Sequence, residues 1–376
     1  MTDIKIFGAI GDGVADDTAS IQKALNEAGE VYFPAGKYKV SATLKIKSNT
    51  TIKADKAAYT FLADHSMHER FDFMFCNEDM VGGNENIVID GGIWDGNCGN
   101  NPRGELFGGG YTGTMFNFRK VKNVSLLNIE FRNPECYYTR FTEVDGITVD
   151  NIWFNSSIIR PNQDGIHLAG FCYNAVITNL KGSNRSPNDD FVALNADDCL
   201  RRLQNLDCLN GEIKNVVVDN LYSPYCHSFV RLLSVDSPIS DVKMSNMKGT
   251  CKCFAINADG ARYILKASRF LNKDDERYYT GSGMLTNIAV NNMEIYSRTP
   301  QKAIVLVETN CKNFVINNFK SSRKYMPLTH AVSVGYNAPH TVTVATAKGA
   351  KVYKKALHKR VNLKPTEYNS ITIDMD

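Results

Sequence analysis

A short pattern of alternating apolar and polar residues recurs along the chain. Each copy begins with Asn or another polar residue and continues apolar–x–apolar–x–Asn–apolar, as in NVSLLNI at 123–129 and NVVVDNL at 215–221. Alternation over a few residues predicts a short strand with one buried face. Further copies lie at 146–152, 174–180, 241–247, 287–293 and 313–319, and a looser copy lies at 86–93.

The second Asn of each copy sets the repeat length. These residues are Asn128, Asn151, Asn179, Asn220, Asn246, Asn292 and Asn318. Four of the six intervals between them are 23 to 28 residues long. One such strand cannot bury its apolar face alone, but strands stacked at about 4.8 Å per coil form parallel sheets around a common core. The repeated Asn then occupies the same bend in every coil, where it tolerates left-handed backbone angles.

The repeat therefore predicts an all-β fold, a single-stranded right-handed parallel β-helix. A leucine-rich repeat is the nearest competing solenoid, but it needs an L-x-x-L-x-L frame that these copies lack. We expect one domain over residues 1–376, divided into three parts. These are an N-terminal cap and first coil at 1–50, the coils at 51–347 and a C-terminal tail or cap at 348–376.

The N-terminal part predicts a helix that covers the open end of the solenoid. Asp17 and Thr18 precede apolar residues at helical spacing, so a capping helix is expected from there to Gly29. The stretch 31–38 then predicts strand, turn and strand. The acidic residues Asp12, Asp16 and Asp17 are expected in turns and caps. The basic C-terminal tail is expected to cover the other end.

A second strand follows each Asn pattern, and aligning these strands brings polar residues into register. NQDGIHLAG at 162–170, NDDFVALNADD at 188–198 and YCHSFVRLLS at 225–234 occupy corresponding places. Asp164 precedes Asp189 by 25 residues, which is one coil length. The residues expected in adjacent layers of one ladder on the outer wall are Asp164, Asp189, Asp190 and His227. The alignment also places His167, Ala193 and Arg231 in one column, with Tyr138 and Arg140 on the same face one coil earlier.

Carboxylates one or two layers apart repel one another, which raises at least one pKa. One carboxyl can then stay protonated while another is ionised. Hydrolysis of an acetal requires this combination, because the acid protonates the departing oxygen while the carboxylate deprotonates water. The ladder therefore predicts an acid/base site that cleaves glycosidic bonds.

The same motifs carry a resemblance to a known family. The opening FGAIGDGVADDTASIQKAL, followed by VYFPAGKYKV, is similar to the N-terminal cap of the pectin-lyase-like β-helix superfamily. FRNPECYY at 131–138, NQDG at 162–165, NDDFVAL at 188–194 and CHS at 226–228 resemble, in order, the central motifs of the polygalacturonase-like glycoside hydrolases, family 28.

The resemblance implies roles for the four site residues. Asp189 would be the general acid, Asp164 and Asp190 would hold and activate water, and His227 would support the acid or bind substrate. The family inverts at the anomeric carbon and needs no metal or other cofactor. Its Arg–x–Lys motif, which grips the uronate carboxylate, has only weak equivalents here in Arg262 or Arg231. Substrate-binding candidates are thus Arg231, His167, Tyr138, Arg140 and Arg262.

Composition narrows the partners but adds no chemistry. The net charge of +3 in 376 residues gives no basis for expecting a nucleic-acid or membrane partner. The first residues lack a basic-then-apolar leader and no apolar run approaches 18 residues, so a cytoplasmic location is expected unless a leader was removed. The ten cysteines are scattered, and Cys251 with Cys253 forms a lone C-x-C, so buried free thiols are expected.

Three other functions fit the same fold. A polysaccharide lyase would abstract a proton beside a uronate carboxylate and leave an unsaturated product. A fructotransferase-type enzyme would also use acidic residues and would release cyclic anhydrides. A glycan-binding or tail-fibre-like module would have no activity and would be a trimer. For the hydrolase, the expected partner is a uronate-containing, pectin-like oligo- or polysaccharide, bound by a monomer or homo-oligomer.

Overall fold

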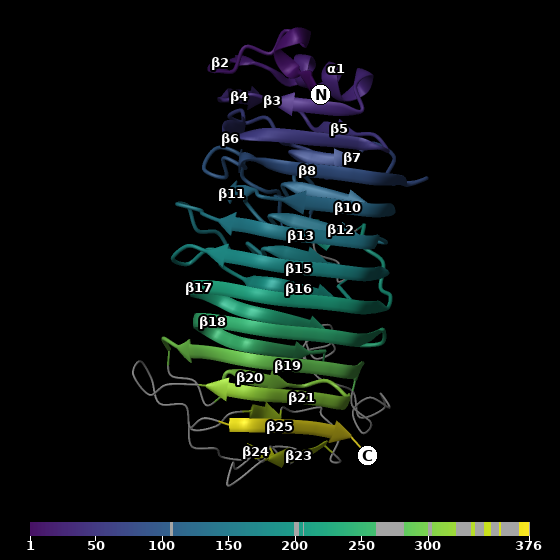
Figure 1. The fold of residues 1–376 in the computed structure, drawn as a ribbon, viewed down its shortest axis with the longest axis vertical. Coiled ribbons are helices and arrows are strands. Elements are labelled where there is room, and N and C mark those ends of the chain that lie inside the picture. The colour runs from purple at the N-terminus through teal and green to yellow at the C-terminus, as the bar shows by residue number, and fades with distance from the viewer. Residues whose placement is uncertain are drawn as a thin grey trace.

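The computed structural model shows a tall stack of coils, with the N-terminus at one end and the last strand at the other (Figure 1). It describes residues 1–105, 108–198, 203–205, 207–260, 282–299 and 303–320, and further strands within 332–375. Nearly all pairing is parallel and joins one coil to the next, so the chain is the parallel β-helix that the repeat predicts.

Three ladders of strands run along the stack. The first is made of β1 (Thr2–Asp3), β3 (Glu30–Phe33), β6 (Thr50–Leu62), β8 (Asn84–Asp95), β10 (Val121–Leu127), β13 (Asp145–Phe154), β15 (Cys172–Gly182), β17 (Ile213–Leu233), β18 (Pro238–Asp259), β19 (Met284–Ser297) and β21 (Cys311–Lys320). The second contains β2 (Asp12–Asp16), β4 (Gly36–Val40) and β11 (Glu130–Arg132), with the later parts of the long strands beyond their Asn bends.

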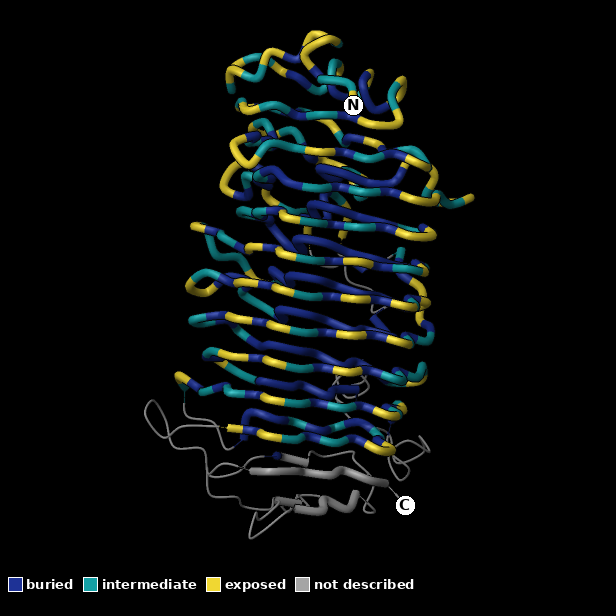
Figure 2. The backbone as a smooth tube through the Cα atoms, viewed as in Figure 1, coloured by how far each residue is buried: buried dark blue, intermediate teal, exposed yellow. Residues whose placement is uncertain are grey.

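The third ladder carries the residues of the predicted site. It contains β5 (Leu44–Ile46), β7 (Phe75–Asn77), β9 (Phe116–Arg119), β12 (Thr139–Thr142), β14 (Ile166–Leu168) and β16 (Asp190–Asn195), the ends of β17 and β18, and then β20 (Val305–Val307), β22 (Val332–Val334) and β24 (Tyr353–Lys354). In Figure 2 the front strands alternate between buried and more exposed segments, as the apolar–polar pattern requires.

The repeated asparagines lie at the bends, as predicted. Asn128, Asn151, Asn179 and Asn220 all have φ between 55° and 57°. This left-handed conformation is unfavourable for most residues but accessible to Asn. Their side-chain amides also bond from coil to coil; for example, the Asn151 amide donates to the Asn128 oxygen at 2.8 Å.

A column of aromatic rings fills the core along the axis. Phe75, Trp94 and Phe116 pack edge to face or tilted, with centroids 4.9 to 5.6 Å apart. The contacts continue through Phe131, Phe154, Phe191 and Phe229. Burial of each ring stabilises the fold by roughly 1.5–3 kcal/mol, so every coil is held by the coils above and below it. The strands therefore keep one register, which in turn fixes the outer wall.

Both ends of the stack are covered. The helix α1 (Thr18–Glu27) packs on the first coil beside the short 3-10 helix η1 (Ile4–Phe7). Asp17 is the N-cap residue of α1, as expected, but its side chain makes no hydrogen bond to the helix and accepts hydrogen bonds from the amides of Ile10 and Gly11. At the other end β25 (Tyr368–Met375) runs antiparallel to β21 and to β23 (Val342–Thr346), which ends the parallel repeat.

Two smaller expectations can be compared with the structure. Among the residues it describes, every cysteine is free, and all but Cys253 are buried, as expected. No helix in the described part of the chain has the length and apolar character needed to cross a membrane.

Candidate active site

The third ladder brings the three predicted aspartates together. Ile166 pairs with Val192, and Asp190 pairs with Ser228, so Asp164, Asp190 and Ser228 stack in successive layers. One carboxylate oxygen from each of Asp164, Asp189 and Asp190 lies within 4.8 Å of the others. The His227 ring approaches from the next coil, with Nδ1 3.4 Å from Asp189 Oδ1.

The glycine after Asp164 explains how the layers come this close. A Cβ atom on Gly165 would lie 2.5 Å from the carbonyl oxygen of Phe191 and 3.1 Å from the Phe154 ring. The Gly165 amide instead donates to the carbonyl of Asp190 at 2.9 Å. A larger residue would push the two coils apart, so the Asp–Gly pair sets the spacing of the cluster.

Asp164 belongs to a buried chain of charged groups. Its Oδ2 lies 2.7 Å from His167 Nδ1, and the other ring nitrogen of His167 lies 2.9 Å from Asp198 Oδ2. Burial alone would lower the pKa of His167, but the two carboxylates raise it to about 9. Burial raises the pKa of Asp164 to about 6 despite the His167 hydrogen bond. His167 is therefore a cation that orients Asp164, and it is not exposed to bind substrate.

Asp190 is the carboxyl that holds its proton most firmly. It is 2% exposed, and burial together with the charge of Asp189 raises its pKa to about 8. Arg231 Nη1 lies 3.6 Å from Asp190, while Nη2 of the same side chain lies 3.4 Å from Asp259. Arg231 is 8% exposed and contacts both carboxyls. The positive charge of Arg231 offsets the negative charge of these buried carboxyls. The sequence had instead predicted that Arg231 binds the carboxylate of a uronate.

Asp189 faces outward from the cluster. Its side chain is 24% exposed, against 6% for Asp164 and 3% for Asp190. The Asn162 amide donates to its Oδ2 at 3.3 Å. Burial would lower the pKa of His227, but the contacts with Asp189 and Cys253 raise it to about 10. The thiol of Cys253 lies 3.2 Å from His227 Nε2. Asp189 therefore has a cationic neighbour and an open side.

The predicted substrate contacts of Tyr138 and Arg140 are wrong. The Tyr138 ring points into the core, where its hydroxyl contacts the hydroxyls of Ser156 and Ser186. Arg140 does share a column with His167, as the alignment predicted, but it is fully buried and makes two hydrogen bonds to Asp207, at 3.0 and 2.9 Å. Neither side chain can reach a ligand on the outer wall. Arg262 lies outside the described residues.

The sequence reasoning missed four groups around the cluster. Tyr137, and not Tyr138, lies on the outer wall of the β-helix, where its ring stacks on the His167 ring with centroids 4.1 Å apart. Asp198 is the last residue of the NDDFVALNADD stretch, which also contains Asp189. The stretch has a second pair of aspartates at its end, and this pair could have identified Asp198 from the sequence. Asp259 and Cys253 are brought in by pairing between β17 and β18, with register shifts near Cys226, which no motif signals.

The arrangement places three carboxyls and two cationic side chains where protons can pass between them. Among the described residues, only this cluster has three acidic groups close enough to hold a cation. Arg231 and His227 already place positive charge 3.4 to 3.6 Å from two of its members. These cations offset the mutual repulsion of the carboxylates. The cluster is therefore built to share protons.

Known proteins are similar to parts of this chain. A family model described as rhamnogalacturonase A/epimerase, pectate lyase-like matches residues 1–188. The pre-neck appendage protein of Bacillus phage B103 is 35% identical over 133 residues, which are 35% of this chain and 15% of that protein. Mannuronan C5-epimerase AlgE5 of Azotobacter vinelandii is 51% identical over 61 residues, or 13% of this chain and 6% of the epimerase.

Two solved structures share the fold over most of the chain. The N-terminal fragment of bacteriophage phi29 gene product 12 superimposes with a TM-score of 0.59 at 17% identity, covering 89% of this chain and 59% of that one. The family 28 exopolygalacturonase of Yersinia enterocolitica gives a TM-score of 0.51 at 14% identity, covering 90% and 78%. At these identities the likeness shows the fold alone.

Proposed function

Since the chain belongs to the rhamnogalacturonase A/epimerase, pectate lyase-like family, we propose that it is a glycoside hydrolase whose acid/base groups are Asp164, Asp189 and Asp190. The observation that carries the proposal is the convergence of three carboxyls within 4.8 Å on the wall of the β-helix. Membership in family 28, a pectin-like uronate substrate and the role of each residue are parts of this proposal.

In this mechanism Asp190 passes its proton to Asp189, and Asp189 delivers that proton to the departing oxygen. Asp189 is the most exposed of the three carboxyls and therefore the one that can reach a bound glycan. Asp190 keeps a proton at neutral pH and Asp164 is ionised, so the cluster holds both a proton and a base. Water attacks the anomeric carbon and loses a proton to Asp164 while the bond to the leaving oxygen breaks. His227 and Arg231 stabilise the remaining negative charge.

The short distance between the carboxyls bears on the stereochemistry. Inverting glycosidases generally separate acid and base by roughly 6.5–9.5 Å to leave room for water. Here the oxygens lie within 4.8 Å. This separation is nearer to the roughly 5–5.5 Å of retaining enzymes, so the inversion that we propose requires the water to lie beside Asp164 and Asp190, against the sugar ring, and not midway between acid and base.

We predict that purified protein adds water to its substrate and releases the inverted anomer first. A panel of glycans would be digested with and without a chelator, with mass detection of products and proton NMR of the new anomeric centre. Products lighter by one water, with ultraviolet absorption, would indicate a lyase. Cyclic anhydrides would indicate a transferase, and retention would make one aspartate a nucleophile.

We predict that kcat/KM rises with pH near 6 and falls near 8. The lower limb comes from Asp164, whose pKa of about 6 means that it is protonated, and no longer a base, in more acidic solution. The upper limb comes from Asp190, which loses the shared proton above its pKa of about 8. Initial rates at a low concentration of a neutral substrate, measured across this pH range, would test both. An optimum below pH 5 would mean that the carboxyls have ordinary pKa values and that neither Asp164 nor Asp190 sets the pH dependence in the proposed way.

A second function is favoured by the phage relatives. The B103 appendage protein is similar over 35% of this chain, so a glycan-binding module of a tail appendage, assembled as a homo-oligomer, is the alternative. This alternative predicts binding without turnover on every glycan in the panel.

A further inference from the structure

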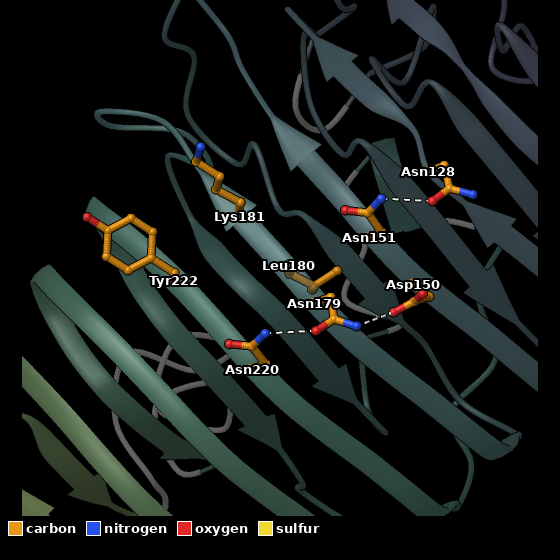
Figure 3. A pocket seen from close by; sticks show the side chains of 8 residues that line it. All are labelled: Asn128, Asp150, Asn151, Asn179, Leu180, Lys181, Asn220 and Tyr222. Atoms are coloured by element: carbon orange, nitrogen blue, oxygen red, sulfur yellow. Dashed lines mark hydrogen bonds between the residues drawn. The ribbon is translucent and has the colours of Figure 1, made fainter. Parts of the chain in front are cut away.

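A groove lies along the Asn bends, on different ladders from the aspartate cluster. Its volume is about 530 Å³. The residues that line it are Asn128, Asp150, Asn151, Asn179, Leu180, Lys181, Asn220 and Tyr222. In Figure 3 the row of amides lies on one side, and Lys181 and Tyr222 lie on the other. Because the lining comes from the strands β10, β13, β15 and β17 and their bends, the groove runs along the stack.

The amide side of the groove presents hydrogen-bond acceptors. Asn220 donates to the Asn179 oxygen at 2.7 Å, but Asn179 donates to Asp150 at 2.6 Å and not to Asn151. The amide row is therefore interrupted, and within the described residues the side-chain oxygens of Asn151 and Asn220 accept no hydrogen bond. Figure 3 shows both oxygens pointing towards the side of Lys181 and Tyr222.

The opposite side presents an aromatic ring and a cation, Tyr222 and Lys181, and Trp153 adjoins Lys181 just outside the lining. Trp153 pairs with Lys181, and Lys181 pairs with Tyr222, so the three side chains form one column with one member per coil. Trp153 is 37% and Tyr222 is 43% exposed. The Lys181 ammonium lies 5.3 Å from the centre of the Trp153 ring. Large rings that remain exposed in an ordered column are typical of binding surfaces.

We propose that this groove is a second carbohydrate site, which binds a glycan chain laid along the axis of the β-helix. Sugar rings have apolar C–H faces that pack on aromatic rings, and hydroxyls that bond to amide oxygens, carboxylates and ammonium groups. The coils are about 4.8 Å apart and each offers one member of the Trp153–Lys181–Tyr222 column, so successive sugars meet a ring, an ammonium group and a second ring in turn. The groove is lined by one carboxylate, Asp150, and one ammonium group, Lys181, and this balance of charge favours hydroxyl-rich chains over polyphosphates.

The chain contains a built-in optical probe for this proposal. It has two tryptophans, and Trp94 is fully buried in the core, so a ligand-dependent change in fluorescence reports on Trp153. Measurements would use Asp189→Asn protein, in which turnover is suppressed. The probes would be hexasaccharides of β- and α-linked glucose, mannose, xylose, galactose and galacturonate.

We expect saturable fluorescence changes with at least one hexasaccharide and a loss of affinity of about tenfold in Tyr222→Ala. Trp153→Phe should abolish the signal. Val176→Ala is the matched control, because Val176 is 44% exposed on the same strand as Lys181 but does not line the groove. Its affinity should equal that of the parent.

Three results would overturn the proposal. These are no fluorescence change with any hexasaccharide, equal affinity in Tyr222→Ala and the parent, or conversion of an oligomer to a monomer by Tyr222→Ala without glycan binding. The last result would make the groove a contact between copies of the chain. Absence of hydrolysis with binding intact would refute the proposed enzyme and leave this site standing.

Discussion

Replacing Asp189 with Asn should lower kcat roughly a thousandfold, the usual effect of removing a general acid. The substitution keeps the shape of the side chain but removes the proton that the departing oxygen needs. The new carboxamide could still accept the hydrogen bond that Asn162 donates to Asp189 at 3.3 Å, and could still lie beside His227. The fold should therefore be unchanged, and KM should move little because a proton donor acts mainly in the transition state.

The matched control for this variant is Asp145→Asn. Asp145 is exposed at the start of β13, where it accepts a hydrogen bond from the Asn174 amide, and it has no place in the cluster. Both proteins would be assayed on the substrate found in the glycan panel, with circular dichroism as the test of folding. An Asp189→Asn enzyme with an unaltered kcat would remove Asp189 from the mechanism, whereas a loss in Asp145→Asn would point to a nonspecific effect.

The fold could be predicted because each coil repeats the same residue types at the same places. Each bend needs a residue that tolerates positive φ, and Asn128 and Asn151 supply it one coil apart. The interval between bends then fixes the register of the following strands. For this reason Asp164 and Asp190 could be placed in adjacent layers from the sequence, and the structure brings them together.

The direction of individual side chains could be predicted less well. Tyr137 and Tyr138 are adjacent aromatics just before β12. Alternation continued back from Arg140 predicts that Tyr138 faces outward, but both tyrosines precede β12, so the alternation of the strand does not extend to them. The structure shows that Tyr138 fills the core beside Phe154 while Tyr137 stacks on His167.

Contacts made by irregular segments could not be predicted at all. Asp207 and Asn205 belong to the longer connection between β16 and β17, where no repeat sets the register. Asn205 accepts a hydrogen bond from the Tyr137 hydroxyl at 3.0 Å, and Asp207 pairs with Arg140. These two contacts place Asn205 and Asp207 over the wall beside the cluster. They also explain why Arg140, correctly placed in its column, is closed to substrate.

Replacing Arg140 with Leu should lower the free energy of unfolding by about 3–5 kcal/mol, because it leaves a buried carboxylate without its partner. The guanidinium is fully buried, makes two hydrogen bonds to Asp207 and donates from Nε to Asn117 at 2.7 Å. Arg70 also forms an ion pair with Asp207, but at 3.9 Å and 34% exposed it would offset only part of the loss. Equilibrium unfolding in urea, followed by circular dichroism, would give the difference.

Two further variants separate charge from packing in that result. The double variant Arg140→Leu and Asp207→Leu should recover much of the loss, since no unpaired charge remains buried. Arg132→Leu breaks the pair with Glu130 at 2.6 Å, but Arg132 is 33% exposed, so it should cost no more than about 1 kcal/mol. If Arg140→Leu costs no more than Arg132→Leu, Asp207 must reach water or take up a proton. The pair would then not be what holds Asp207 against the wall, and burial would not explain why Arg140 fails to bind substrate.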